Sequence, residues 1–141
     1  AKQHEQRRPF RHLPKQFSKG ILIGNIAIVP KKTTETRYHY VIADMIGAKV
    51  LYDNISLKQT AIMMAHYLAE GQYMPDHILE IDKHFASKLF EISNFKRMMK
   101  QAQKDKDEEQ EFIYENKLKE ANRSADELKR KIQASFNSLF N

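Results

Sequence analysis

Cysteine is absent from this sequence of 141 residues. Its absence excludes a disulfide framework, a cysteine-ligated zinc site, a thiolate nucleophile and an iron–sulfur cluster, and we expect a reducing, intracellular environment. The sequence also lacks any run of about 18 apolar residues, so we expect no membrane-spanning helix. Its start, AKQHEQRRPFRHLPK, has no apolar segment typical of a secretion signal, and we expect none.

Motifs for catalysis are missing as well. There are four glycines and no glycine-rich phosphate loop, and neither a G-x-S-x-G turn nor an H-E-x-x-H motif occurs. His77, Glu80 and His84 have the i, i+3, i+7 spacing of a possible metal site. They border an apolar helical stripe, however, and lack a second set of ligands. The sequence therefore predicts a protein that is not an enzyme and has no cofactor, metal or small-molecule substrate.

Positive charge is concentrated at one end of the chain. Residues 1–20 contain six lysines and arginines against the single acid Glu5, while the whole chain has a formal net charge of +6. Residues 21–141 therefore carry a net charge of only +1. A basic segment is attracted to nucleic acid or to acidic protein surfaces. Because nucleic-acid-binding proteins of ribosomes usually extend their basic surface over the folded body, the nearly neutral body favours a protein partner.

Residues 1–19 have the pattern of an extended N-terminal arm. Pro9 and Pro14 interrupt the segment, and its apolar residues follow neither a helical nor a strand period. We expect charged and apolar side chains of this arm to bind a partner together, and these are Arg7, Arg8, Phe10, Arg11, Leu13, Lys15 and Phe17. The alternative is a solvated tail that only aids solubility.

Residues 20–55 have the pattern of a small antiparallel meander. The stretch GILIGNIAIVP is rich in β-branched residues, and its alternation changes phase at Gly24-Asn25. This change indicates either a bulge or a tight two-residue hairpin. About three strands are recognisable, with a turn expected between Asp44 and Gly47. So small a sheet needs helices packed on one face.

Three tyrosines lie on these strands near two cations. Tyr38, Tyr40 and Tyr52, with Arg37 and Lys49, are similar to an aromatic stacking platform for single-stranded nucleic acid. Ordinary cross-strand aromatic packing against a helix also explains the pattern, and we favour it.

Residues 56–71 have the pattern of a central helix. Ser56 and Gln59 match the S-x-x-Q capping box, and Gly71 is expected to end the helix. One buried face is predicted by Leu57, Ala61, Met64, Ala65 and Leu68.

Residues 74–140 contain two further apolar stripes. Pro75 is expected at the first helical position, and nine polar residues, 103–111, separate the stripes. Either one continuous helix or a hairpin fits the periodicity. We favour an antiparallel hairpin with a turn near residues 105–108, because a single rod leaves both stripes unburied. Folding back brings Phe95 to Leu118, Ile92 to Ala121 and Phe85 to Leu128.

Two segments, KGILIGNIAIVP and VLYDNISLKQTAIMMAHYL, resemble small virion structural proteins of tailed phages that infect marine bacteria. The resemblance covers under a third of the chain and implies a component of a capsid, neck or tail.

The predicted fold class is α+β: a small antiparallel β-meander packed on a central helix, then a long antiparallel helical hairpin, with an extended N-terminal arm. We expect residues 1–19 to form the arm and residues 20–141 a single domain. The predicted function is a structural or assembly component of a large complex, in first place a phage virion assembled in the host cytoplasm. Its partners would be other structural subunits, including a second copy, and no membrane. The alternative is a cytoplasmic accessory protein bound to nucleic acid through the arm, associated with a ribosome or a genome.

Overall fold

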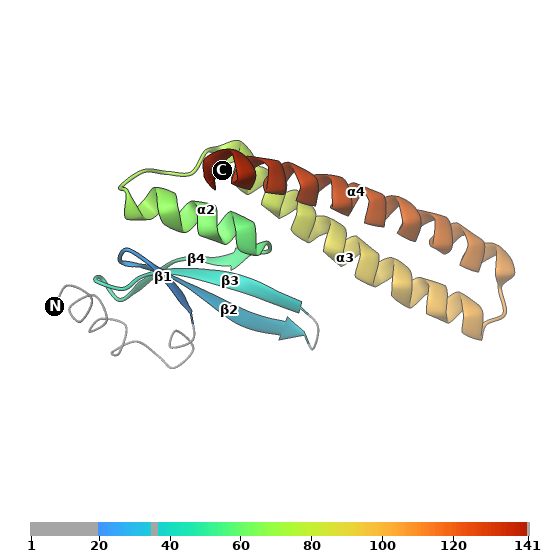
Figure 1. Cartoon of the computed structure of the whole chain (residues 1–141). Helices are drawn as coiled ribbons and strands as arrows, with labels where there is room; N and C mark the ends of the chain where they lie inside the picture. Colours follow the sequence, from blue (N-terminus) through green and yellow to red (C-terminus); the bar gives the residue numbers. More distant parts are fainter. Residues whose placement is uncertain (1–19, 35–36, 141) are drawn as a thin grey trace.

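A computed structural model describes residues 20–34 and 37–140 of the chain. In this part, four strands are followed by three helices (Figure 1). The strands are β1 (Ile21–Ile23), β2 (Ile26–Thr34), β3 (Arg37–Asp44) and β4 (Lys49–Ile55), and the helices are α2 (Lys58–Ala69), α3 (Asp76–Lys104) and α4 (Glu108–Phe140). The α+β fold is as predicted. The predicted arm, with all its partner-binding residues, lies outside the described residues.

The strands form one antiparallel sheet in the order β1-β2-β3-β4. Ile23 pairs with Ile26, so a two-residue turn at Gly24-Asn25 joins β1 to β2. Gly24 has a φ of +59°, a left-handed value that glycine adopts at little steric cost. The change of phase in the sequence therefore marks a hairpin rather than a bulge, and it adds a short fourth strand to the three recognised from the sequence.

Both faces of the central strands β2 and β3 are apolar. Ile28 lies opposite Ile42 in the register, and both belong to the main core, which the helices share. Val29 lies opposite Val41, and both belong to a second apolar cluster on the other face. We call these the inner face and the outer face of the sheet. Only the inner face was predicted from the sequence.

Helix α2 lies across the inner face and contacts all four strands (Figure 1). It also contacts α3 and α4, so it separates the sheet from the helical hairpin. Because it is covered on two sides, Ala61, Met63, Met64 and Ala65 are all buried. Helix α2 is thus the central helix that the sequence predicted.

The C-terminus of α2 is closed by a Schellman motif. Gly71 has a φ of +76°, as its predicted place after the helix requires. The Gly71 N–H donates to the carbonyl oxygen of Leu68 at 3.0 Å, and the Gln72 N–H donates to the carbonyl oxygen of Tyr67 at 2.7 Å.

Two predicted helix starts differ from the structure. The capping box at Ser56 and Gln59 is not formed, because Leu57 is the N-cap residue and makes no side-chain cap. The Gln59 side chain instead donates to the side-chain oxygen of Gln133 on α4 at 3.2 Å. Pro75 is the N-cap of α3, one position before the first helical residue.

Helices α3 and α4 form the predicted antiparallel hairpin rather than one rod (Figure 1). Lys106 takes a φ of +55° at the turn, and its N–H donates to the carbonyl oxygen of Gln103 at 3.2 Å. The N–H of Asp107 donates to the carbonyl oxygen of Ala102 at 2.9 Å. Asp107 Oδ1 then accepts from the Gln110 N–H at 3.1 Å, which caps the start of α4.

The hairpin is held by the apolar stripes that the sequence predicted. Phe85 and Ile92 from α3 and Ala121, Ala125 and Ile132 from α4 are buried in the main core. The two alanines allow the helices to approach closely where larger residues face them. No helix in the described ranges is long and apolar enough to cross a membrane.

Candidate interaction surfaces

The start of α2 is attached to α3 by a buried carboxylate. Asp82 on α3 is 1% exposed. Its Oδ2 accepts a hydrogen bond from the Ser56 N–H at 2.9 Å, and its Oδ1 accepts one from the Leu57 N–H at 3.0 Å. These amides have no partner within α2, because the first N–H groups of a helix find no intrahelical acceptor. The Asp82 charge also lies at the positive end of the helix dipole. Asp82 therefore replaces the predicted capping box.

Burial sets the protonation behaviour of this carboxyl. Loss of solvent raises the pKa of Asp82 above 3.8, and the Ser56 and Leu57 amides partly oppose the shift because they favour the charged form. The hydroxyl of Thr60 also opposes it. That hydroxyl is buried and falls short of a well-aligned hydrogen bond. The site connects three elements, and its geometry fits a structural anchor.

The predicted tyrosine platform is divided between two hollows. Tyr38 and Tyr40 line a groove of about 390 Å³ on the inner face, together with Ile21, Ile28, Pro30 and Lys58. Tyr52 lines a different hollow, beside Tyr73. The Arg37 guanidinium donates to the carbonyl oxygen of Leu89 on α3 at 3.0 Å, so it holds the sheet against the hairpin. The structure thus keeps two of the three tyrosines together and gives Arg37 a packing role.

The outer face of the sheet carries a compact apolar cluster. It contains Ala27, Val29, Val41, Ala43 and Met45, all of which are buried, with Leu22 packed against them. The turn beside it is fixed by Asp44, whose Oδ1 accepts from the Ile46 N–H at 3.0 Å and from Asn25 Nδ2 at 3.2 Å. The Met45 N–H donates to the carbonyl oxygen of Asn25 at 2.9 Å, which extends the pairing of β2 and β3 beyond their ends.

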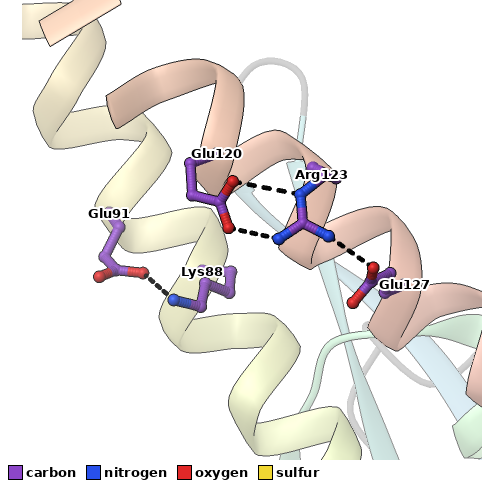
Figure 2. Close-up of polar contacts among 5 residues, drawn as sticks. All are labelled: Lys88, Glu91, Glu120, Arg123 and Glu127. Carbon is purple, nitrogen blue, oxygen red and sulfur yellow. Dashed lines mark hydrogen bonds and ion pairs between the residues drawn. The ribbon is translucent and has the colours of Figure 1, made fainter. Parts of the chain in front are cut away.

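Charged side chains cover the outer surface of the hairpin. Figure 2 shows Arg123 between Glu120 and Glu127 on α4, with Lys88 and Glu91 paired on α3. Arg123 Nη1 lies 2.7 Å from Glu127 Oε1, and Lys88 Nζ lies 2.9 Å from Glu91 Oε2. The Arg123 hydrogen bond and charge lower the pKa of Glu120, and Glu120 raises the pKa of Arg123. Exposed pairs of this kind contribute little to stability and are screened by salt.

Large apolar side chains also reach the hairpin surface. Phe90 on α3 is 68% exposed and Phe112 on α4 is 64% exposed. Both lie outside the stripes that join the two helices. A hollow of about 380 Å³ opens near the turn, between residues of α3 such as Met98 and residues of α4 such as Tyr114.

The histidines and glutamate weighed as metal ligands do not form a site. Among residues 20–34 and 37–140, no three histidine, aspartate or glutamate side chains are grouped to hold a metal ion. His77, Glu80 and His84 are exposed positions on α3. The i, i+3, i+7 spacing places these three residues along one helix, and it does not by itself make a metal site.

Comparison of the chain with protein-family models, with curated proteins and with solved structures found no match. Its class is therefore given by its own geometry: an α+β protein in which a two-sided apolar sheet and one central helix carry a long helical hairpin.

Sequence reasoning missed two features of these surfaces. Asp82 looks like an ordinary surface acid beside Lys83, and nothing local links it to Ser56. The outer face had a recognisable pattern, because IAIV in β2 and YVIA in β3 are continuous apolar runs, which are typical of strands buried on both faces.

Proposed function

We propose that this chain is a structural, non-enzymatic subunit of a large assembly. It docks onto neighbouring subunits through the basic arm at residues 1–19 and through the hairpin of α3 and α4. A tailed-phage virion is the assembly we put first, because residues 19–30 and 50–68 resemble small virion proteins. In that setting the chain would be assembled in the host cytoplasm and located in the particle.

The exposure of Phe90 and Phe112 is the observation that carries this proposal. The hairpin extends beyond the body formed by the sheet and α2 (Figure 1). Its outward surfaces present one aromatic ring on each helix, with 68% of Phe90 and 64% of Phe112 exposed. Aromatic side chains are enriched where protein interfaces bury most surface. A rigid projection that carries such rings can insert between neighbours without rearranging its own core.

Charge supports the same function for the arm. Residues 1–20 hold six of the 24 lysines and arginines and a single acid, whereas the remainder of the chain is close to neutral. The arm thus provides a positively charged extension of a body that has little net attraction for polyanions. An acidic groove on a neighbouring subunit is the partner that this distribution fits.

Quantitative mass spectrometry of purified particles tests the function. We expect the full chain at a copy number that matches a structural component after washing in high salt. A chain that is missing from the particles, or present only in traces, contradicts the proposal.

A pair of variants tests the hairpin separately. We expect Phe90→Ser with Phe112→Ser to lower incorporation into particles at least several-fold while the chain stays folded, because both rings are exposed. Tyr73→Ser is the matched control, since Tyr73 is 85% exposed and lies between α2 and α3. If the double phenylalanine variant and the Tyr73→Ser control are incorporated equally, the hairpin is not part of the interface.

The basic arm also favours a second candidate, an accessory protein bound to nucleic acid. Binding by phosphate contacts would weaken steeply with salt, and it would be lost in a chain with Arg7→Ser, Arg8→Ser and Arg11→Ser. Affinity for RNA or DNA that does not change with salt, or no affinity, counts against this candidate and leaves the structural role as the proposal.

A further inference from the structure

Tyr38 is the exposed member of the tyrosine pair in the groove on the inner face. It is 52% exposed, whereas Tyr40 is partly buried against the main core. The ends of β2 and β3 extend beyond the start of α2, so this helix leaves that part of the sheet uncovered (Figure 1). Cross-strand packing against a helix therefore accounts for Tyr40, and it does not account for the exposed ring of Tyr38.

Two exposed lysines lie beside this ring. Lys58, the first residue of α2, lines the groove. Lys32 lies opposite Tyr38 in the register, which places both side chains on the same face of the sheet. Within residues 20–34 and 37–140, neither lysine forms an ion pair. The described residues that line the groove include no acid, so its charge is positive.

The rest of the groove is apolar and large enough for a planar ligand. Ile28, which is 1% exposed, lines it, and Pro30 lies opposite Tyr40 in the register. The volume of about 390 Å³ is in the range of pockets that hold small ligands. The groove thus offers a tyrosine ring to a flat apolar group and ammonium groups to an anion.

We propose that this groove binds single-stranded nucleic acid, with a base stacked on Tyr38 and the flanking phosphates at Lys32 and Lys58. Unpaired bases stack on aromatic side chains whatever their sequence, and lysines neutralise the phosphates between them. A duplex keeps the faces of its bases inside the helical stack, so it should not bind here in this way. An acidic peptide would pair with the lysines but leave the Tyr38 ring without a planar partner.

This inference goes beyond the proposed structural function, which does not require it. It places a nucleic-acid site on the folded body, whereas the second candidate function places one on residues 1–19. The two sites differ in chemistry, because stacking on Tyr38 adds a contribution that salt does not screen.

Fluorescence anisotropy of the full-length chain with a labelled oligothymidine tests the stacking. We expect Tyr38→Leu to lower the affinity roughly tenfold or more and Tyr38→Phe to retain it, because the phenyl ring still stacks. Tyr52→Leu is the matched control, since Tyr52 is 37% exposed on β4 and lines a different hollow. Circular dichroism should show all three variants folded. Failure to bind the oligothymidine, or equal affinities of Tyr38→Leu and Tyr52→Leu, overturns the proposal.

Salt dependence separates the groove from the basic segment. Lys32→Gln with Lys58→Gln should flatten the slope of log affinity against log salt by about 0.7 for each lysine. In a chain with Arg7→Ser, Arg8→Ser and Arg11→Ser, the remaining affinity should still fall with Tyr38→Leu. Binding that this triple variant abolishes and that Tyr38→Leu leaves unchanged would place the nucleic acid on residues 1–19 and overturn the groove site.

Photocrosslinking locates the bound base directly. An oligonucleotide that carries iodouracil should crosslink to Tyr38, with the site mapped by mass spectrometry, and an excess of unlabelled single strand should compete while duplex should not. Crosslinks only to Tyr52 or to residues 1–19 would overturn the proposal. So would ring resonances of Tyr38 that shift with a purified neighbouring subunit and not with the oligonucleotide, a result that assigns the groove to a protein partner.

Discussion

The Asp82 carboxylate accepts a hydrogen bond from the backbone amide of Leu57, 25 positions earlier in the chain, at 3.0 Å. This contact joins the end of the sheet, the start of α2 and the second turn of α3 at one buried point. It attaches the start of α2 to the hairpin, and it is the basis of the first two predictions.

Replacing Asp82 with asparagine should destabilise the chain. An amide has one oxygen acceptor, so its NH₂ group would face one of the two N–H donors and leave it unsatisfied. We expect Asp82→Asn to lower the free energy of unfolding at neutral pH by about 1–3 kcal/mol, measured by urea denaturation. Glu80→Gln is the matched control on the same helix, because Glu80 is exposed, and it should change little. Equal effects of the two variants would contradict the role of Asp82.

The stability that Asp82 contributes should depend on pH in a defined direction. Burial raises the pKa of Asp82 in the folded chain above 3.8, so the folded chain binds this proton more tightly than the unfolded chain. The part of the stability that depends on this proton is therefore fully present below pH 3.8 and is lost as the pH rises through the folded pKa. The loss expected for Asp82→Asn at neutral pH comes from the two amide hydrogen bonds that the carboxylate keeps there.

The difference in unfolding free energy between the wild type and Asp82→Asn isolates this titration. It should grow as the pH is lowered through the folded pKa, and the carboxyl carbon of Asp82 should titrate by NMR above 3.8. A midpoint at or below that value would show that the two amide hydrogen bonds outweigh the loss of solvent.

The turn of the hairpin should become more stable with glycine. Lys106 has a φ of +55°, where a side chain is strained. We expect Lys106→Gly to raise the free energy of unfolding by roughly 0.5–1 kcal/mol, because glycine relieves this strain. Lys100→Gly, in the exposed interior of α3, should lower it by about 1 kcal/mol. Thermal denaturation should therefore show a higher stability for Lys106→Gly and a lower stability for Lys100→Gly. Equal losses of stability in the two variants would contradict this account.

The ion pairs shown in Figure 2 should affect the pKa values of their carboxyl groups more than the free energy of unfolding. Arg123→Gln removes the hydrogen bond and the charge that lower the pKa of Glu120, so this pKa should rise toward 4.5. The change should be clear by NMR at low salt and smaller at high salt. Lys119→Gln is the control, because Lys119 pairs with Glu115 at 3.8 Å instead. A Glu120 pKa that moves with Lys119→Gln and not with Arg123→Gln contradicts the pairing.

Local signals predicted much of the fold. Gly24 and Gly71 mark a turn and a helix end that require left-handed backbone, and the periodic stripes of α3 and α4 predicted the helices and their pairing. The turn at Lys106 has no glycine or proline, yet the need to bury both stripes was enough to place it. The Asp107 cap at the start of α4 was seen only in the structure.

Long-range contacts account for what the sequence did not predict. Ser56 and Gln59 have the spacing of a capping box, but Asp82 provides two acceptors from another helix and Gln59 binds Gln133. Tertiary contacts thus override a local preference. Of the candidate sites, Tyr38 and Tyr40 share a groove as their strand spacing suggests, whereas Tyr52 lies opposite Ile42 in the register and lines a separate hollow.

Photocrosslinking from the arm in the assembled complex tests the structural role most directly. A photoreactive residue introduced at Arg7 or Arg8, in the basic segment, should crosslink to another protein subunit of purified particles, and the site should map by mass spectrometry to an acidic surface of that subunit. The same probe at Tyr73, the exposed position between α2 and α3, should give no such product. Crosslinks from Arg7 and Arg8 to nucleic acid alone, or to no other component, would contradict the account.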